Sequence, residues 1–140
     1  MVRKINNHAK ISKESDLRDY HNRRVKYVNG MCALWQILVN SKDPRSTEKE
    51  INRRAEEWDR NNSKGHNYHD LHFMTKFGAI DYVRRIVQKC QKKVVLRLET
   101  GRGNNSIDNV PVIKNALMAL YTGSIRQDPN NPGVLRLIVG

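Results

Sequence analysis

The chain has 140 residues and a formal net charge of +12, with 26 Lys and Arg residues against 14 Asp and Glu residues. This length suits one domain, or one domain with an appended helical segment, and the positive excess favours a polyanionic partner. Two cysteines exclude a disulfide framework, and no apolar run approaches the roughly 20 residues that span a bilayer, so we expect no membrane partner. The basic N-terminus lacks the apolar core of a secretory signal, so we expect a cytoplasmic protein, with the nucleus as the alternative.

The first half of the chain predicts helices. Residues 1–14 are polar and basic without an apolar period, and we expect a disordered basic tail there. Residues 15–66 carry apolar side chains at helical spacing in two stretches, separated by a break at 41–44. Ile51 and Trp58 belong to the apolar stripe of the second stretch. The pattern therefore predicts a helical extension over residues 15–66.

The second half, residues 67–140, predicts strands that alternate with helices. The expected elements are a short strand at 68–73, an amphipathic helix at 78–92, a strand at 94–99, a helix that begins near Pro111, and a strand at 134–139. This β-α-β-α-β order predicts an α/β (α+β) fold, a two-layer sandwich in which the helices pack on the sheet.

Asp70 and His72 are the candidate catalytic residues. Residues two apart on a strand face the same side, so Asp70 and His72 project together. Leu71 faces the opposite side, with His69 and Phe73. A carboxylate beside a histidine can orient the ring and pair a base with an acid. The alternative is a solvated Asp–His pair on an open sheet face.

A glycine-rich turn follows the strand at 94–99. Bare backbone N–H groups in such a turn can bind an anion, and Arg102 adds a charge suited to phosphate. If the first two strands are parallel, this turn and the end of the 68–73 strand lie at the same sheet edge. The alternative for this segment is a tight strand-to-helix turn with a polar tip. The alternative for the basic face of the 78–92 helix is simple exposure to solvent. The candidate nucleic-acid-binding residues are Thr100, Gly101, Arg102, Gly103, Asn104, Asn105 and Ser106 in and before the turn, and Arg84 and Arg85 on the 78–92 helix.

His66, His69 and His72 recur every three residues, with Asp70 among them, which raises the question of a metal site. A spacing of three places side chains on both faces of a strand, so one strand cannot present all three imidazoles. We therefore expect neither a metal nor another cofactor.

Two motifs in this half resemble the Smr (small MutS-related) domain, whose hallmarks are Asp-Leu-His-Gly and Thr-Gly-x-Gly. They are Asp70-Leu71-His72 and, about 30 residues later, Thr100-Gly101-Arg102-Gly103-Asn104-Asn105-Ser106, followed by Pro111 and a helix. The resemblance covers about residues 67–140. Residues 15–66 are similar to the helical extension that precedes this domain in eukaryotic members.

The resemblance implies a two-layer fold and endonuclease activity, on RNA in the translation-linked eukaryotic members and on DNA in others. It implies that Asp70 and His72 act at the scissile phosphate, with the loop from Thr100 beside it. Phe73 occupies the place of the motif's Gly, where it would narrow the site or stack on a base. His69 replaces a residue that is usually aliphatic.

The favoured hypothesis is an endonuclease that cleaves RNA phosphodiester bonds by metal-independent acid–base chemistry, acting on mRNA in translation-linked quality control. The alternatives are a non-catalytic RNA- or ribosome-binding module, which Phe73 and the basic helix faces favour, and a DNA-nicking endonuclease. The expected partners are RNA, with DNA as the alternative, and the ribosome.

Overall fold

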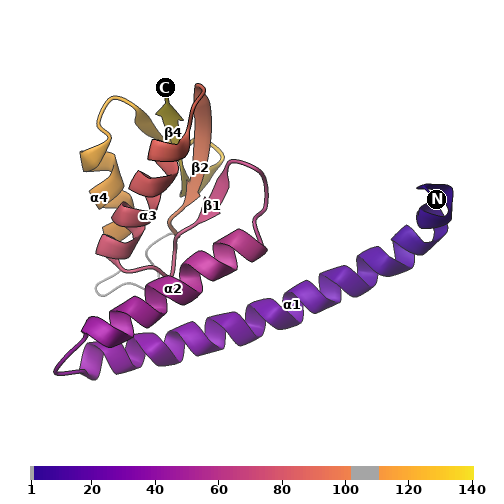
Figure 1. The fold of residues 1–140 in the computed structure, drawn as a ribbon, viewed down its shortest axis with the longest axis horizontal. Coiled ribbons are helices and arrows are strands. Elements are labelled where there is room, and N and C mark those ends of the chain that lie inside the picture. Colours follow the sequence, from indigo (N-terminus) through magenta and orange to yellow (C-terminus); the bar gives the residue numbers. More distant parts are fainter. Residues whose placement is uncertain (1, 102–110) are drawn as a thin grey trace. The chain divides into compact units, whose positions relative to one another are not determined.

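The computed structural model describes residues 2–101 and 111–140, which form two compact units, Met1–Pro44 and Arg45–Gly140 (Figure 1). The first unit consists of one long helix, α1 (Val2–Asn40). This helix begins well before Ser15, where the apolar pattern predicts its start after a disordered tail. Neither Pro nor Gly occurs between residues 2 and 29, so the backbone there contains no helix breaker.

Helix α2 (Arg45–Asn61) belongs to the second unit, so the predicted helical extension 15–66 is divided between the two units. Its predicted apolar stripe is confirmed, because Ile51, Ala55 and Trp58 are all buried. Within the second unit, α2 contacts the first strand and the helix that follows it. The α/β part of the chain therefore includes one helix more than the predicted domain at 67–140.

The second unit contains a four-stranded mixed sheet in the order β1-β2-β4-β3. Its strands are β1 (Tyr68–Asp70), β2 (Val94–Glu99), β3 (Ile125–Asp128) and β4 (Asn131–Val139). The pair β1–β2 is parallel, and β4 is antiparallel to both of its neighbours. The fold is thus a mixed α+β fold, with one strand more than the β-α-β-α-β prediction.

Helices α3 (Lys76–Lys89) and α4 (Val112–Leu120) lie on one side of this sheet (Figure 1). The core is apolar: it contains Leu96, Leu98, Leu135 and Leu137 from the sheet, with Ala79, Val83 and Leu117 from the helices. These leucines pair across β2 and β4 and share one face of the sheet. The strand residues between them therefore project from the other face.

Asn52 joins α2 to the start of α3. Its Nδ2 donates to the hydroxyl of Thr75 at 2.9 Å, and the backbone N–H of Thr75 donates to its Oδ1 at 2.9 Å. Thr75 in turn caps α3 by accepting from the backbone N–H of Gly78. A Cβ at Gly78 would come within 2.1 Å of the Asn52 side chain, so this close approach of α2 and α3 requires glycine.

Among the described helices, none is long and apolar enough to cross a membrane.

Candidate functional site

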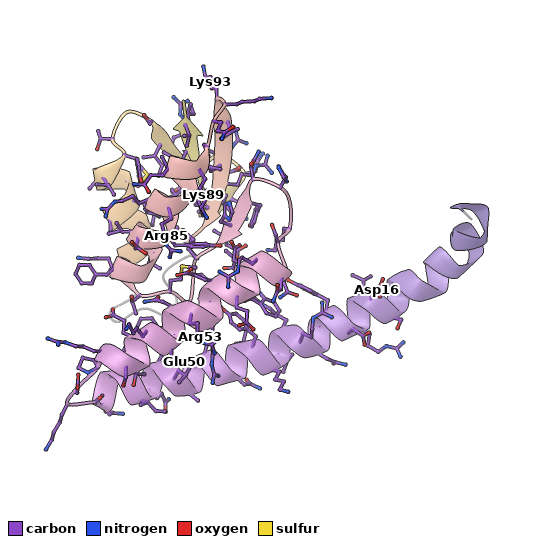
Figure 2. All side chains as sticks on the ribbon, in the orientation of Figure 1. Asp16, Glu50, Arg53, Arg85, Lys89 and Lys93 are labelled. Atoms are coloured by element: carbon purple, nitrogen blue, oxygen red, sulfur yellow. The ribbon has the colours of Figure 1, made fainter. Side chains whose placement is uncertain are left out.

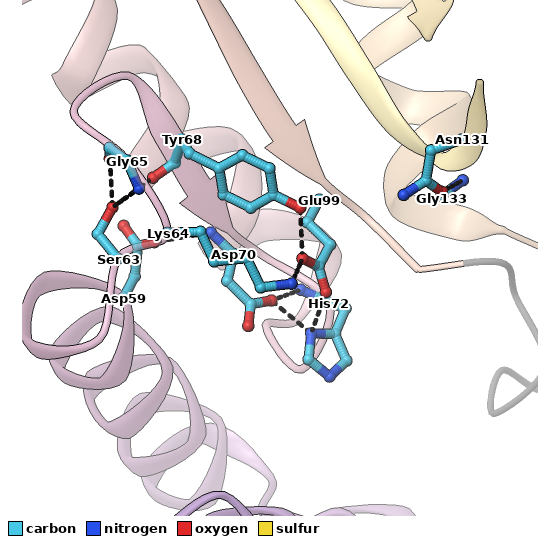
Figure 3. Close-up of polar contacts among 10 residues, drawn as sticks. All are labelled: Asp59, Ser63, Lys64, Gly65, Tyr68, Asp70, His72, Glu99, Asn131 and Gly133. Atoms are coloured by element: carbon cyan, nitrogen blue, oxygen red, sulfur yellow. Dashed lines mark hydrogen bonds and ion pairs between the residues drawn. The ribbon is translucent and has the colours of Figure 1, made fainter. Parts of the chain in front are cut away.

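Asp70 and His72 lie together at the carboxyl end of β1. The Nδ1 atom of His72 is in direct contact with Oδ1 of Asp70 (Figure 3), and the backbone N–H of His72 donates to the same oxygen at 3.3 Å. Leu71 between them is fully buried, and its N–H donates to the carbonyl of Glu99 at 2.8 Å. The buried Leu71 thus fixes the turn that brings the two predicted side chains together.

Glu99, at the end of β2, completes this cluster. It is the register partner of Asp70, and its Oε2 lies 3.8 Å from Nδ1 of His72. Its Oε1 accepts from the hydroxyl of Tyr68 at 2.6 Å and from Nζ of Lys64 at 2.9 Å. Burial and the hydrogen bond to Glu99 raise the pKa of Tyr68, so this hydroxyl remains a donor to Glu99 even in alkaline solution.

Two carboxylates on one side of the ring determine how His72 can act. Carboxylates only accept, so the proton of the imidazole lies on Nδ1. The other ring nitrogen, Nε2, points away from both carboxylates (Figure 3). In the neutral ring Nε2 accepts a proton, and in the charged ring it donates one. One atom of His72 can therefore serve as base or acid toward a group outside the cluster.

Asp70, His72 and Glu99 also offer three metal-ligating atoms that lie within 4.8 Å of one another. The ammonium group of Lys64 already binds Glu99, so a cation would compete with it. Neighbouring His69 does not join this group, because its ring turns to the helix side of β1.

Asp59 of α2 is a buried carboxylate beneath β1, with 2% of its surface exposed. Its Oδ1 accepts from the backbone N–H of Asp70 at 2.7 Å. Its Oδ2 accepts from Nδ1 of His69 at 2.8 Å and from the hydroxyl of Tyr82 at 2.6 Å. His69, which departs from the motif's aliphatic residue, thus has a specific partner. Asp59 holds the backbone of a candidate catalytic residue, so α2 is part of the site.

Phe73 packs beneath His72 instead of offering a face to a base. Its ring centroid lies 4.2 Å from that of the imidazole, and only 7% of the residue is exposed. Of the two expectations for a bulky residue in place of the motif's Gly, base stacking is therefore wrong. Phe73 supports one side of the His72 ring.

The described start of the glycine-rich turn lies beside His72. Thr100 is buried, and its N–H donates to the carbonyl of Gly133 at 2.9 Å, which anchors the turn to β4. Gly101 has a φ of +77°, and a Cβ there would lie 3.3 Å from Cβ of His72. Both features favour glycine. The other predicted residues of this turn, Arg102, Gly103, Asn104, Asn105 and Ser106, lie outside the described residues.

Arg84 and Arg85 lie on α3, which covers the leucine-rich face of the sheet, whereas Asp70 belongs to the other face. Arg85 (Figure 2) is held there by ion pairs with Glu56 at 2.7 Å and Asp81 at 2.9 Å. Arg84 is exposed on the same helix. The structure does not bring these two arginines together with Asp70 and His72.

Sequence reasoning missed Glu99 and Asp59. The signal for Glu99 was available, because parallel pairing places the last residue of β2 beside the last residue of β1, and alternation places it on the same face as Asp70. Asp59 had no local signal, because all three of its partners lie in later segments of the chain.

No family model matches this chain, and no curated protein matches it. Among solved structures, the chain is similar to the solution structure of the B3BP Smr domain. The identity is 25%, the TM-score is 0.46, and the match covers 66% of this chain and 99% of that one.

Proposed function

We propose that this protein is an endoribonuclease and that His72 is its acid–base residue. The observation that carries the proposal is the position of the imidazole: Nδ1 faces Asp70 and Glu99, Nε2 points away from them, and Gly101 adjoins the ring. The basic charge of +12 and the two Smr-like motifs support a nucleic-acid substrate. By its resemblance to translation-linked members, the substrate is mRNA in translation-linked quality control.

RNA supplies its own nucleophile, the 2′-hydroxyl. In the proposed reaction, a base takes the proton of this hydroxyl, and the 2′-oxygen attacks phosphorus. The bond from phosphorus to the 5′-oxygen breaks, and the leaving oxygen receives a proton. His72 Nε2 serves one of these proton transfers and a water molecule the other. General acid–base help of this kind contributes roughly 10²–10⁴-fold. The products carry a 2′,3′-cyclic phosphate and a 5′-hydroxyl.

The remaining groups hold the ring and the phosphate. Asp70 and Glu99 fix the direction of Nε2 through Nδ1, as a carboxylate does for a catalytic histidine. The turn that begins at Thr100 and Gly101 would place N–H groups and the predicted Arg102 where charge develops on the phosphate oxygens. Such preorganised donors are typically the largest electrostatic contribution to catalysis.

The test is cleavage of a single-stranded RNA by the purified protein in the presence of EDTA, with analysis of the product ends. We expect cyclic-phosphate and 5′-hydroxyl ends. We expect a loss of about 10²–10⁴-fold in the His72→Ala variant. His66→Ala is the matched control, because it removes an exposed imidazole from the loop before β1 and should leave the rate unchanged. Loss of activity in EDTA together with 3′-hydroxyl ends would contradict the internal-nucleophile mechanism and favour a cation at Asp70, His72 and Glu99.

A second candidate is an RNA- or ribosome-binding module without catalysis. It is favoured by Phe73, which packs on His72 where the motif has a residue without a side chain. If the wild-type protein binds RNA but cleaves neither RNA nor DNA, and the Asp70→Asn/His72→Ala variant binds equally well, the module is the better description. Cleavage of single-stranded DNA at a comparable rate would instead favour the DNA-nicking alternative.

A further inference from the structure

The sheet face that carries Asp70 and Glu99 also carries a row of arginines. Arg97 of β2 pairs in register with Arg136 of β4, and Arg136 pairs with Arg126 of β3. We call these three residues the arginine row. Adjacent strands lie about 4.8 Å apart, so the three side chains start from neighbouring positions on three successive strands. In the same register, Arg97 pairs with Tyr68 of β1, whose hydroxyl binds Glu99.

The positive charges of the arginine row are only partly compensated by the described side chains. Like charges directly opposite one another in a sheet are destabilising. Arg97 and Arg126 are exposed, and among the side chains described, those of residues 15–101 and 111–140, no acidic group forms an ion pair with either. Arg136 is held in place by buried Asp128, whose Oδ2 accepts from its Nε at 3.0 Å. Two of the three guanidinium groups therefore face solvent without an ion-pair partner among the described side chains, although the charge of Arg97 also acts on the Asp128 carboxylate.

The next register row of this face is apolar and exposed. Val95 and Ile138 pair across β2 and β4, with 47% and 42% of their surfaces exposed. The face therefore offers positive charge beside small apolar side chains, which suits a strand of alternating phosphates, sugars and bases. At the other end, Glu99 lies two residues from Arg97 along β2, a step of about 7 Å toward His72.

We propose that the arginine row binds the phosphates of single-stranded RNA next to the bond that is cleaved. The inference rests on the proposed function, because it treats the Asp70–His72 cluster as the point where the same strand is cut. Charge complementarity and continuity with that cluster select RNA as the occupant. Tyr68 is the one aromatic residue in register with the arginine row, so phosphate contacts dominate and binding depends strongly on salt.

The experiment measures binding of a fluorescent, fully 2′-O-methylated single-stranded RNA by anisotropy over a range of KCl concentrations. This probe lacks the 2′-hydroxyl and cannot be cut by the proposed mechanism. The variant is Arg97→Ala/Arg126→Ala; Arg136 is left in place so that Asp128 keeps its partner. Each lost contact with a single strand should lower the slope of log affinity against log salt by about 0.7, so the double variant should lose about 1.4. This change in the salt slope corresponds to an affinity about 14-fold weaker than that of the wild type at 0.15 M salt.

Two further variants make the result specific. Lys49→Ala/Lys89→Ala removes the same charge from exposed positions on α2 and α3 (Figure 2 labels Lys89). This lysine variant should change the salt slope by less than half as much as Arg97→Ala/Arg126→Ala does. Arg97→Lys/Arg126→Lys keeps the charge and should restore most of the slope. If the row variant and the lysine variant lose the same slope, the proposal is overturned. A loss seen with double-stranded DNA but not with single-stranded RNA would overturn the choice of occupant.

Binding to this probe does not depend on catalysis. A wild-type protein that fails to cleave RNA would contradict the proposed function and leave the binding result standing. A row variant that binds the probe like the wild type would contradict the arginine row and leave the function of His72 untouched.

Discussion

Asp59 offers a stringent test of how the site is held together. Its carboxylate is buried and accepts three hydrogen bonds, from Asp70, His69 and Tyr82. Hydrogen bonds to a charged group contribute about 1.5–3 kcal/mol each, so three at the lower end amount to about 4–5 kcal/mol. Removing one partner from a buried charged network costs a similar amount, about 3–5 kcal/mol. We therefore expect Asp59→Ala to lose about 4 kcal/mol of unfolding free energy.

Asp59→Asn is the more informative variant, because a loss of 4 kcal/mol approaches the total stability of many domains, about 5–15 kcal/mol. The amide keeps one acceptor oxygen and replaces the other by a donor. With the oxygen in the place of Oδ2, the bonds from His69 and Tyr82 remain and the N–H of Asp70 loses its acceptor, at a cost of about 1–3 kcal/mol. If the end of β1 shifts by about 1 Å, the rate of RNA cleavage should fall by up to about 10²-fold.

The assay combines urea unfolding with single-turnover RNA cleavage at urea concentrations where every variant is folded. Glu57→Ala on the same helix is the control, because Glu57 pairs only with exposed Arg53 among the described contacts, and such pairs contribute at most about 1 kcal/mol. Tyr82→Phe removes one of the three donors, and its effect should not add to that of Asp59→Asn. A loss below about 1 kcal/mol in Asp59→Ala would contradict a stabilising role of the three hydrogen bonds to Asp59.

Three further predictions concern the turn and two titrating side chains. Gly101→Ala should cost about 1–2 kcal/mol of stability, because the φ of Gly101 is positive. It should also slow RNA cleavage, because the new Cβ contacts His72, and an unchanged rate would contradict this contact. Burial raises the pKa of Tyr82, so unfolded chains lose its proton first and stability should fall above about pH 10. Urea unfolding at rising pH should show a shallower decline in Tyr82→Phe, and an equal decline would count against the buried hydroxyl. The backbone N–H of Asn130 lowers the pKa of Asp128, so the stability that this carboxylate contributes is present at neutral pH and lost in acid. The stability difference between the wild type and Asp128→Asn should therefore shrink toward pH 2, and a constant difference would be the contrary result.

Local patterns in the sequence predicted the elements that alternate most regularly. The strand at 94–99 followed from side-chain alternation. The Asp70–His72 pair was predicted on one strand at 68–73, but β1 ends at Asp70, and the turn at buried Leu71 brings His72 beside it. The parallel β1–β2 pairing placed Gly101, at the start of the glycine-rich turn, beside His72. Strand β3 was missed because Ile125 is its one apolar residue, and an edge strand of four residues needs no alternating apolar face.

Residues that act through long-range contacts left no such pattern. Asp59 lies in a charged stretch of α2 that reads as a solvated helix face, yet it is buried by segments that follow it in the chain. The arginine row depends on the register of β4 with both of its neighbours, and the missed strand β3 contributes one of its three members. The pairing of the strands and the packing of α2 therefore determined the positions of these residues, which local periodicity could not predict.

In the proposed reaction, His72 promotes attack by the 2′-hydroxyl of RNA. This step is tested most directly by mapping one cleavage position in a single-stranded RNA and then replacing the nucleotide on the 5′ side of that bond by its 2′-deoxy form. We expect cleavage at this bond to be abolished while other positions are still cut. Cleavage of the substituted bond at an unchanged rate would contradict it, because the nucleophile would then be a water molecule and not the RNA itself.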